Sequence, residues 1–235
     1  LPRKRHVLGK GYVLADARFV LGLGGTNMDI VASTNLQVVP GDSTPGHISS
    51  SPGGVARNVA ENLARLGLDV RLISAVGDDF YGRRMLELTM QAGVDVQGCW
   101  VWPGDSTSTY LSLHGPDGDL VAAINDMSIL ERMTPEKLDV HAHRVRQAAT
   151  LVADCNLSAS ALDWLFAHSA DKPVFVEAVS AHKCRRIQPW LGRVHTLKLN
   201  RIEAQTLTGA AIPNLEQAYS ATRALCDLGV EQVVL

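Results

Sequence analysis

Short apolar segments are separated by longer segments of helical periodicity along most of the chain, and this alternation constrains the fold more than any other feature. We expect strands within residues 18–25, 69–77, 149–156, 173–179, 195–200 and 231–235, with helices over about 58–66, 80–93, 135–148, 158–169, 201–209 and 214–228. Strands that alternate with helices form right-handed βαβ units around a mostly parallel sheet. The alternation therefore predicts a three-layer α/β/α fold.

Two regions interrupt the alternation. Residues 34–50 are rich in Ser, Thr, Pro and Gly, and residues 94–125 contain short strand patterns with turn signals at Pro103-Gly104 and Pro116-Asp117-Gly118. We expect these regions, about 34–50 and 94–125, to form a small β-flap apart from the main sheet. Residues 1–17 are basic and contain glycine, which is typical of a connector.

Composition argues against a nucleic-acid-binding, zinc-binding or membrane protein. The net charge of −2 over 235 residues gives no overall attraction to nucleic acid or to an anionic membrane. The four cysteines form no Cys-x-x-Cys pair, which argues against a zinc site and favours free thiols in a reducing compartment. No segment approaches the roughly 20 apolar residues of a membrane span. We therefore predict a cytoplasmic protein without a membrane partner.

In a parallel α/β sheet, ligands bind at the carboxyl ends of the strands. Hydrogen-bonding or acidic residues follow nearly every predicted strand, and the candidates for one shared site are Asn27, Asp29, Gly53, Gly54, Asn58, Asn125, Asp126, Asp154, Asn156, Glu177, Asn200 and Glu203. A mixture of donors and acceptors of this kind suits a ligand with several hydroxyl groups.

Each candidate also has a purely structural interpretation. Gly53-Gly54 lets a ligand approach the backbone closely, or it forms a tight turn that leaves Asn58 exposed. Asp29 accepts from two adjacent hydroxyls, or it shapes a turn with Asn27. Asn200 and Glu203 form a capping box, or they serve phosphate and a magnesium-bound water. We interpret His141 and His143 as surface residues, because neither has a carboxylate or cysteine companion in the pattern.

Taken together, three segments resemble the signatures of the ribokinase-like (pfkB) family of carbohydrate kinases. They are "GGTNMDI", "PGGVARNVAENLARLG…ISAVGDDFYG" and "LKLNRIEAQTLTG". The resemblance covers most of residues 18–235. Within the family it is strongest to the pseudouridine kinases, through "DSTPGHI", "STSTYLSL", "VAAINDM", "VADCNLSASAL" and "PVFVEAVSAHK".

The resemblance implies an ATP-dependent transfer of phosphate to the 5′-hydroxyl of pseudouridine. Asn27, Asp29, Gly53, Gly54 and Asn58 would hold the ribose, Thr109 would come from the flap, Asn125 and Asp126 would lie near the base, and Asp154 and Asn156 would lie near the sugar and the transferred phosphate. Asn200 and Glu203 would serve ATP, with Glu203 also serving Mg²⁺. Lys183 matches a family lysine to which we assign no role. The resemblance also implies a homodimer through the β-flap and a monovalent cation such as K⁺ in the full-length protein.

The family's Gly-Ala-Gly-Asp segment, whose Asp is the general base, does not occur in this sequence. We therefore expect the chain to be part of a longer enzyme whose C-terminal portion completes the fold, and to be inactive alone. The segment "LGKGYVL" resembles a connector that follows a winged helix-turn-helix, so binding of nucleic acid depends on such an upstream domain. A kinase for another ribose-like sugar and a nucleoside-sensing regulator stay open as alternatives. A Rossmann oxidoreductase is excluded because no Gly-x-Gly-x-x-Gly joins the first strand to a helix.

Overall fold

The computed structural model describes residues 7–8, 12–13 and 19–235. Most of the connector predicted at residues 1–17 lies outside the described residues. Within that region only two short strands are described, β1 (Val7–Leu8) and β2 (Tyr12–Val13), and they pair antiparallel.

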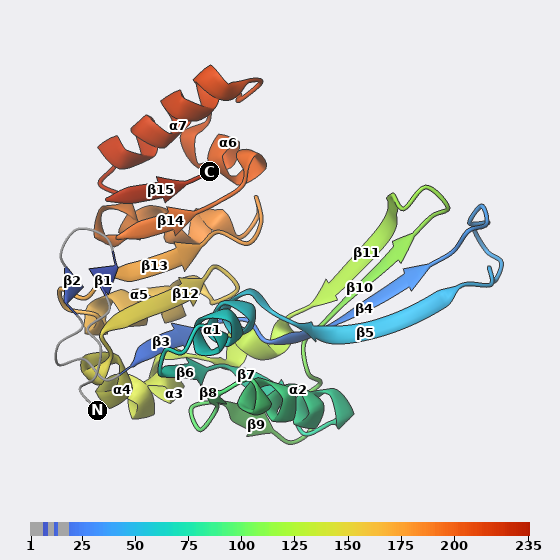
Figure 1. Ribbon diagram of the computed structural model, residues 1–235, viewed down its shortest axis with the longest axis horizontal. Helices are drawn as coiled ribbons and strands as arrows, with labels where there is room; N and C mark the ends of the chain where they lie inside the picture. Colours follow the sequence, from blue (N-terminus) through green and yellow to red (C-terminus); the bar gives the residue numbers. More distant parts are fainter. Residues whose placement is uncertain (1–6, 9–11, 14–18) are drawn as a thin grey trace.

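The described chain is built around a parallel sheet, as the alternation predicts (Figure 1). Every neighbouring pair in this seven-stranded sheet is parallel. In spatial order its strands are β15 (Gln232–Val234), β14 (Thr196–Lys198), β13 (Val174–Glu177), β12 (Thr150–Asp154), β3 (Val20–Leu23), β6 (Val70–Ile73) and β8 (Val94–Asp95). All the carboxyl ends therefore lie at one edge.

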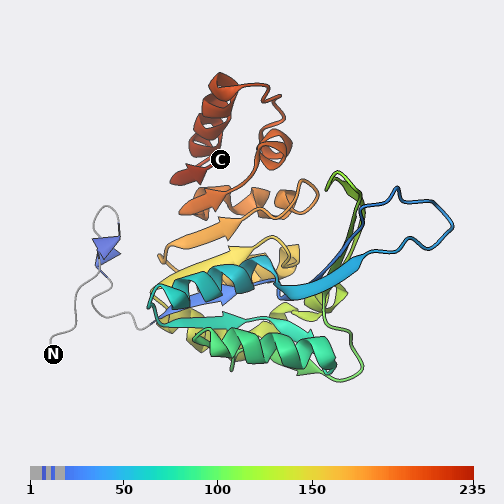
Figure 2. The same cartoon turned by 45° about the vertical axis from the view of Figure 1, so that its right-hand side comes forward.

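Alternate residues of the central strand β3 pack into two different cores. Leu21 and Leu23 join a core with α3 (Pro135–Leu138), α4 (Ala142–Gln147) and α5 (Ala159–His168). Val20 joins the other core with α1 (Val55–Arg65), beside which lies α2 (Phe80–Gln91). Figure 2 shows α1 and α2 together on one side of the sheet. Helices therefore cover both faces, and the predicted three-layer α/β/α fold is confirmed.

Capping side chains set several helix starts. Asp79, Ser158 and Asn214 each accept a hydrogen bond from the backbone N–H three residues on, so that α2, α5 and α7 (Leu215–Asp227) begin where the sequence predicts. The other helical elements are α6 (Arg201–Thr208) and the 3₁₀ segments η1 (Ser128–Arg132), η2 (Asp139–His141) and η3 (Cys184–Arg193).

A second sheet of four strands projects from the body as a flap (Figures 1 and 2). Its order is β11 (Leu120–Asp126), β10 (Thr109–His114), β4 (Asn27–Ser33) and β5 (His47–Gly53). The predicted flap boundaries of 34–50 and 94–125 are therefore partly wrong. Strand β4 belongs to the flap, whereas β8 belongs to the main sheet, and β9 (Trp100–Trp102) pairs with β7 (Ala75–Gly77). Trp100 and Trp102 pack against the main core, which holds β9 in the body.

The prediction that His141 is a surface residue is wrong. Its side chain is buried, and its ring centroid lies 4.7 Å from that of Trp100. Burial, with Arg144 nearby, lowers the pKa of His141 to about 4, so the ring is neutral at physiological pH. His143 is exposed, as predicted.

Two expectations from composition concern the whole described chain. The four cysteines Cys99, Cys155, Cys184 and Cys226 are free thiols. Within residues 19–235, no helix combines the length and the apolar character needed to cross a lipid bilayer.

Candidate functional site

The strand pairing of the flap fixes which side chains share a face. Asp29 on β4 is in register with Tyr110 on β10 and Ser51 on β5, and Asn125 on β11 is opposite Tyr110. Since directly paired residues point the same way, these four side chains lie on one face of the flap. Asn27, two residues before Asp29, lies on the same face.

Thr109 and Asp126 occupy the opposite face. Thr109 pairs with Met28 and with Asp126, one position out of phase with Asp29. Asp126 also accepts a hydrogen bond from the backbone N–H of Ser128, at 3.0 Å. The expectation that Thr109 meets the sugar from the flap, and that Asp126 lies beside Asn125 near the base, in one site with Asp29, therefore disagrees with the register. Strand periodicity separates neighbouring residues onto two faces, and the sequence does not show which face is which.

Asp29, Asn27 and Gly53 form a compact group at the base of the flap. The Asn27 side-chain amide donates to Asp29 Oδ1 at 2.6 Å, and Asn27 pairs with Gly53 across the strands. A Cβ at residue 53 would overlap the Asp29 carboxylate, which explains the glycine. Partial burial raises the pKa of Asp29, and the Asn27 hydrogen bond opposes the shift. Asp29 keeps an acceptor oxygen for a ligand.

Gly54 places the start of α1 directly against the turn between β3 and β4. Its φ of 94° lies in the region that favours glycine, and a Cβ there would come 2.6 Å from Thr26 Cα. Next to it, the N–H of Arg57 donates to the Gly25 carbonyl at 3.2 Å. The glycine pair thus brings the first turn of α1 beside Asn27 and Asp29.

Asp154 connects the turn after β3, the start of α1 and the loop after β12 by hydrogen bonds. Its carboxylate is fully buried and accepts from the backbone N–H groups of Gly25 at 2.9 Å, Ala56 at 2.8 Å and Asn156 at 2.9 Å. Burial raises the pKa of Asp154, and the three amide hydrogen bonds oppose that effect. Since all three partners are protein groups, the structure assigns Asp154 a positioning role and not the predicted direct contact with substrate.

Asn58 lies exposed on the first turns of α1. Its side-chain oxygen accepts from Arg57 at 3.0 Å, while its amide nitrogen has no hydrogen-bond partner among the described residues. Arg57 is buried and also donates to Thr89 and pairs with Glu61. The neighbouring Arg57 therefore fixes the orientation of Asn58, whose free donor is available to a ligand.

Asn200 and Glu203 form a capping box at the start of α6. Glu203 Oε2 accepts from the Asn200 N–H, and Glu203 Oε1 accepts from the Asn200 side chain, both at 2.7 Å. The structural interpretation of this motif is therefore confirmed. Glu203 is buried with both oxygens engaged, so it does not fit a direct Mg²⁺ ligand in this arrangement. Among the described residues, no three His, Cys, Asp or Glu side chains form a metal-binding group.

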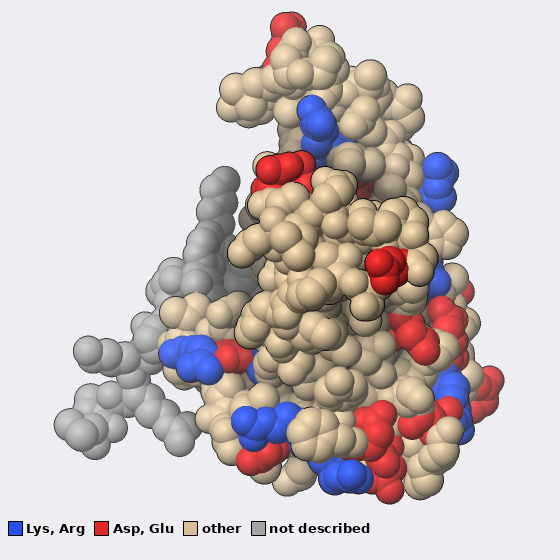
Figure 3. All heavy atoms as spheres, turned by 90° about the vertical axis from the view of Figure 1, so that its right-hand side faces the viewer, with Lys and Arg blue, Asp and Glu red and all other residues tan. Residues whose placement is uncertain are grey.

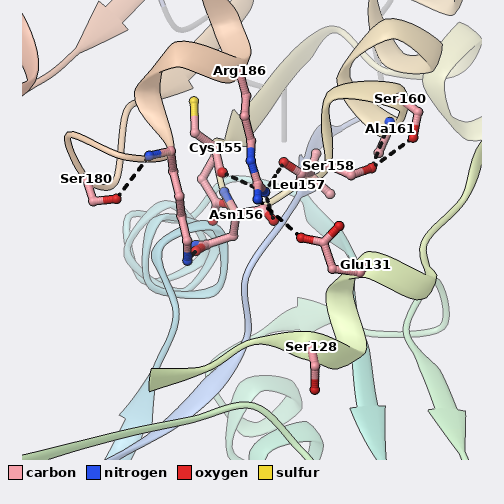
Figure 4. Close-up of polar contacts among 12 residues, drawn as sticks. Ser128, Glu131, Cys155, Asn156, Leu157, Ser158, Ser160, Ala161, Ser180 and Arg186 are labelled. Carbon is pink, nitrogen blue, oxygen red and sulfur yellow. Dashed lines mark hydrogen bonds and ion pairs between the residues drawn. The ribbon is translucent and has the colours of Figure 1, made fainter. Parts of the chain in front are cut away.

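The search for polar residues directly after predicted strands did not identify one basic cluster, formed by Lys183 and Arg186. The loop after β13 and the start of η3 supply Lys183, whose Nζ donates to Asn156 Oδ1 at 2.7 Å, and Arg186. Arg186 donates to the backbone carbonyls of Asn156 and Leu157 and pairs with Glu131 at 3.2 Å, as Figure 4 shows. The signal in the sequence was the basic segment "KCRR", residues 183–186, directly after "VEAVSAH".

These groups lie in a row along the edge of the sheet formed by the carboxyl ends of its strands. Strands β3, β12, β13 and β14 are consecutive neighbours, and their carboxyl ends carry the Asp29 group, Asp154 with Asn156, the Lys183 cluster and the Asn200–Glu203 pair. With strands about 4.8 Å apart, the two ends of this series are separated by roughly 15 Å. That span suits two ligands side by side, or one ligand with two parts.

Comparison with known proteins agrees with this layout. The pfkB family of carbohydrate kinases matches residues 17–235. The chain belongs to the pfkB carbohydrate kinase family. A pfkB protein from Escherichia coli K12 named pseudouridine kinase is 43% identical over 222 residues, covering 94% of this chain and 71% of that protein. The uncharacterized sugar kinase YeiI of the same strain is 44% identical over 233 residues.

A solved structure shows the fold of this chain, and the length of a relative shows how much of that protein the chain covers. The structure of Arabidopsis thaliana ribokinase complexed with ribose and ATP has a TM-score of 0.80 at 21% identity, covering 92% of this chain and 71% of that one, which confirms the ribokinase-like fold. The chain spans 64% of the length of YeiI. About a third of that relative therefore has no counterpart in these 235 residues.

Proposed function

We propose that the protein containing this chain is an ATP-dependent kinase that phosphorylates the 5′-hydroxyl of pseudouridine. The observation that carries the proposal is the group formed by Asp29, Asn27 and the glycine pair, in a chain 43% identical to a pseudouridine kinase. The four free cysteines support a cytoplasmic setting. The 44% identity to a sugar kinase of unstated substrate favours, as second candidate, a kinase for another ribose-like sugar or ribonucleoside.

The sugar side of the proposed reaction depends on Asp29. Its carboxylate accepts from two adjacent ribose hydroxyls, and Asn27 keeps it oriented. Gly53 and Gly54 let the ribose approach the backbone, and Asn58 supplies a donor at the same place. On the flap, Asn125 and Tyr110 share the Asp29 face and are placed to contact the base. The flap excludes water over the bound nucleoside.

The nucleotide side of the site extends along the sheet edge to α6. Asn200 and Glu203 would serve ATP there, and the Glu203 carboxylate would orient a water of a bound Mg²⁺ rather than contact the ion. ATP with Mg²⁺ supplies the phosphoryl group, and a monovalent cation belongs to the same proposal for the full-length protein. The Arabidopsis thaliana ribokinase complexed with ribose and ATP shares this fold.

The test is a substrate panel on the full-length protein. ADP formation from Mg·ATP is measured with pseudouridine, uridine, adenosine, ribose and fructose as acceptors. We expect kcat/KM for pseudouridine to exceed that for each other acceptor by at least about tenfold. A preference for ribose or fructose would overturn the assignment to pseudouridine and favour the second candidate. No turnover with any acceptor, together with ligand-dependent stabilisation, would favour the sensing alternative.

A further inference from the structure

Lys183 is a half-buried cation at the carboxyl edge of the sheet. Its Nζ carries three protons and donates one to Asn156 Oδ1 at 2.7 Å. Within the part of the chain that the structure describes, no carboxylate forms an ion pair with Lys183, whereas the neighbouring Arg186 pairs with Glu131. The ammonium therefore has donors left for a ligand.

The hydrogen bond to Asn156 ties Lys183 to the sugar side of the site. Asn156 is 5% exposed, and its Nδ2 lies where a Cβ on Gly25 would come within 2.6 Å, so the amide packs directly on the turn between β3 and β4. The backbone N–H of Asn156 is held in turn by the buried Asp154. Lys183 is thus separated from the glycine pair by only one side chain and one turn.

The loop that carries Lys183 is fixed as firmly as its partner. Val179 has a φ of 68°, which costs energy for a β-branched residue, and its N–H donates to Glu177 Oε2 at 2.7 Å. Arg186, three residues after Lys183, holds the backbone carbonyls of Asn156 and Leu157 at 3.1 Å and 2.8 Å (Figure 4). The position of the ammonium is therefore set before any ligand arrives.

Half-burying an ammonium that forms no direct ion pair is costly. Burial, together with the charge of Arg186, lowers the pKa of Lys183, and the charges of Asp154 and Glu131 oppose the shift without cancelling it. A bound anion would repay that cost and return the pKa toward its ordinary value. The place of the residue, between the ribose subsite and the Asn200–Glu203 pair, is where a phosphoryl group would pass from nucleotide to sugar.

We propose that Lys183 is a phosphate-contacting residue, held by Asn156 toward the phosphoryl group of the nucleotide or of the phosphorylated product. The proposal deepens the kinase function and rests on it. Lys183 forms no covalent bond and accepts no proton in this role. Its ammonium donates hydrogen bonds to the phosphoryl oxygens and stabilises their charge in a site from which water is excluded.

Three variants of the full-length protein separate charge from structure. Lys183→Gln can still donate to Asn156 but is neutral, Lys183→Arg keeps the charge, and Arg185→Gln is a matched control, because Arg185 is exposed in the same segment. We expect Lys183→Gln to lower kcat by about 100-fold, with the KM for the nucleoside changed less than about threefold. We expect Lys183→Arg to keep more than a tenth of kcat, and Arg185→Gln to match the wild type.

Two further measurements depend only on the positive charge of residue 183. Inorganic phosphate should raise the melting temperature of the wild type but not that of Lys183→Gln. Because the lysine loses its proton at a lower pH than usual and arginine does not, Lys183→Arg should hold its activity to higher pH. This alkaline profile decides the question if the Gln variant does not fold, since an unchanged profile would contradict the proposal.

The results distinguish this inference from the kinase proposal. A kcat for Lys183→Gln within threefold of wild type would overturn the role of Lys183, because it would show that the hydrogen bond to Asn156 is sufficient. Phosphate stabilisation that depends on Lys183, in a wild type that phosphorylates no acceptor, would support the anion site while overturning the kinase proposal.

Discussion

Asp29 is the residue on which the proposed sugar site depends. Its carboxylate is partly buried, receives one hydrogen bond from Asn27 and lies over a residue that must be glycine. Because burial disfavours the charged form, an ionised carboxylate in this position lowers the stability of the fold, and we infer that it serves binding. In the proposed complex, the ribose hydroxyls would donate the further hydrogen bonds that the protein does not provide to this carboxylate.

We predict that Asp29→Asn strongly lowers kcat/KM for the nucleoside while it stabilises the fold. The raised pKa means that the folded state favours the protonated carboxyl, so stability falls as the pH rises through that pKa. A neutral Asn removes this cost and still accepts from Asn27. At pH 7 the melting temperature should rise by about 1–3 °C, while kcat/KM should fall by at least about 100-fold.

The pH dependence provides the control for that prediction. The difference in melting temperature between the variant and the wild type should shrink as the pH is lowered through the raised pKa of Asp29, because the wild-type carboxyl then becomes neutral as well. A near-normal kcat/KM in Asp29→Asn would remove Asp29 from the sugar site.

At the residue scale, the sequence predicted the neighbourhood of the site better than the role of each member. Asn27, Asp29, Gly53 and Gly54 come together because they follow strands whose carboxyl ends share an edge. The burial of Asp154 was not predictable, because its three amide partners come from segments up to 129 residues away in the chain. The face occupied by Thr109 depends on strand register, which residue types alone do not fix.

The junction between the flap and α1 is constrained both by a backbone angle and by lack of space. Gly54 has a φ of 94° and no room for a Cβ, whereas Gly104 has a φ of 82° and nothing within 4 Å. We predict that Gly54→Ala costs at least about 3 kcal/mol of unfolding free energy and that Gly104→Ala costs about 1 kcal/mol. Denaturant unfolding of both variants checks this, and equal costs would show that only the backbone angle matters.

The outer face of the flap is an unpartnered apolar surface. Leu111 pairs with Ile30 and Ile124, so these three side chains lie on the face opposite Asp29. Leu111 is 44% exposed, and Ile48 and Ile124 are each 72% exposed. Figure 3 views the molecule from the side on which the flap projects, and uncharged side chains cover most of the central part of this side. A second copy of the flap would cover these residues, which supports the proposed homodimer.

We propose that the full-length protein is a dimer through this face, and we predict that Leu111→Lys combined with Ile124→Lys makes it a monomer. The two charges would have to be buried against apolar side chains in the paired flaps. Light scattering after size exclusion gives the mass. Val101→Lys is the control, because Val101 is also 44% exposed but lies on β9, away from the flap. A double variant that remains dimeric would place the interface elsewhere.

The elements of the body were predictable from local patterns, and those of the flap were only partly so. Helix caps such as Asp79 and Asn214, and buried strands such as β3, carry their signals in neighbouring residues. Strand β4 directly follows the glycine turn after β3, and its polar start has the pattern of a loop. Only its pairing with β5 and β10 makes it part of the flap.

At the scale of the whole molecule, the parallel sheet gathers residues from across the sequence at one edge. The strand order β14-β13-β12-β3 brings the Asn200–Glu203 pair, Lys183, Asn156 and Asp29 into a single series. The flap then stands beside this series with its polar face continuous with Asp29. The membership of the pfkB family, together with this order, is the basis for placing nucleoside and nucleotide side by side.

The most direct test of the central claim is a crystal structure of the full-length protein with pseudouridine. We predict that two ribose hydroxyls lie within hydrogen-bonding distance of the Asp29 carboxylate, with the ribose against Gly53 and Gly54 and the base facing Asn125 on the flap. A nucleoside bound at any other surface, with Asp29 contacting only Asn27, would contradict the account.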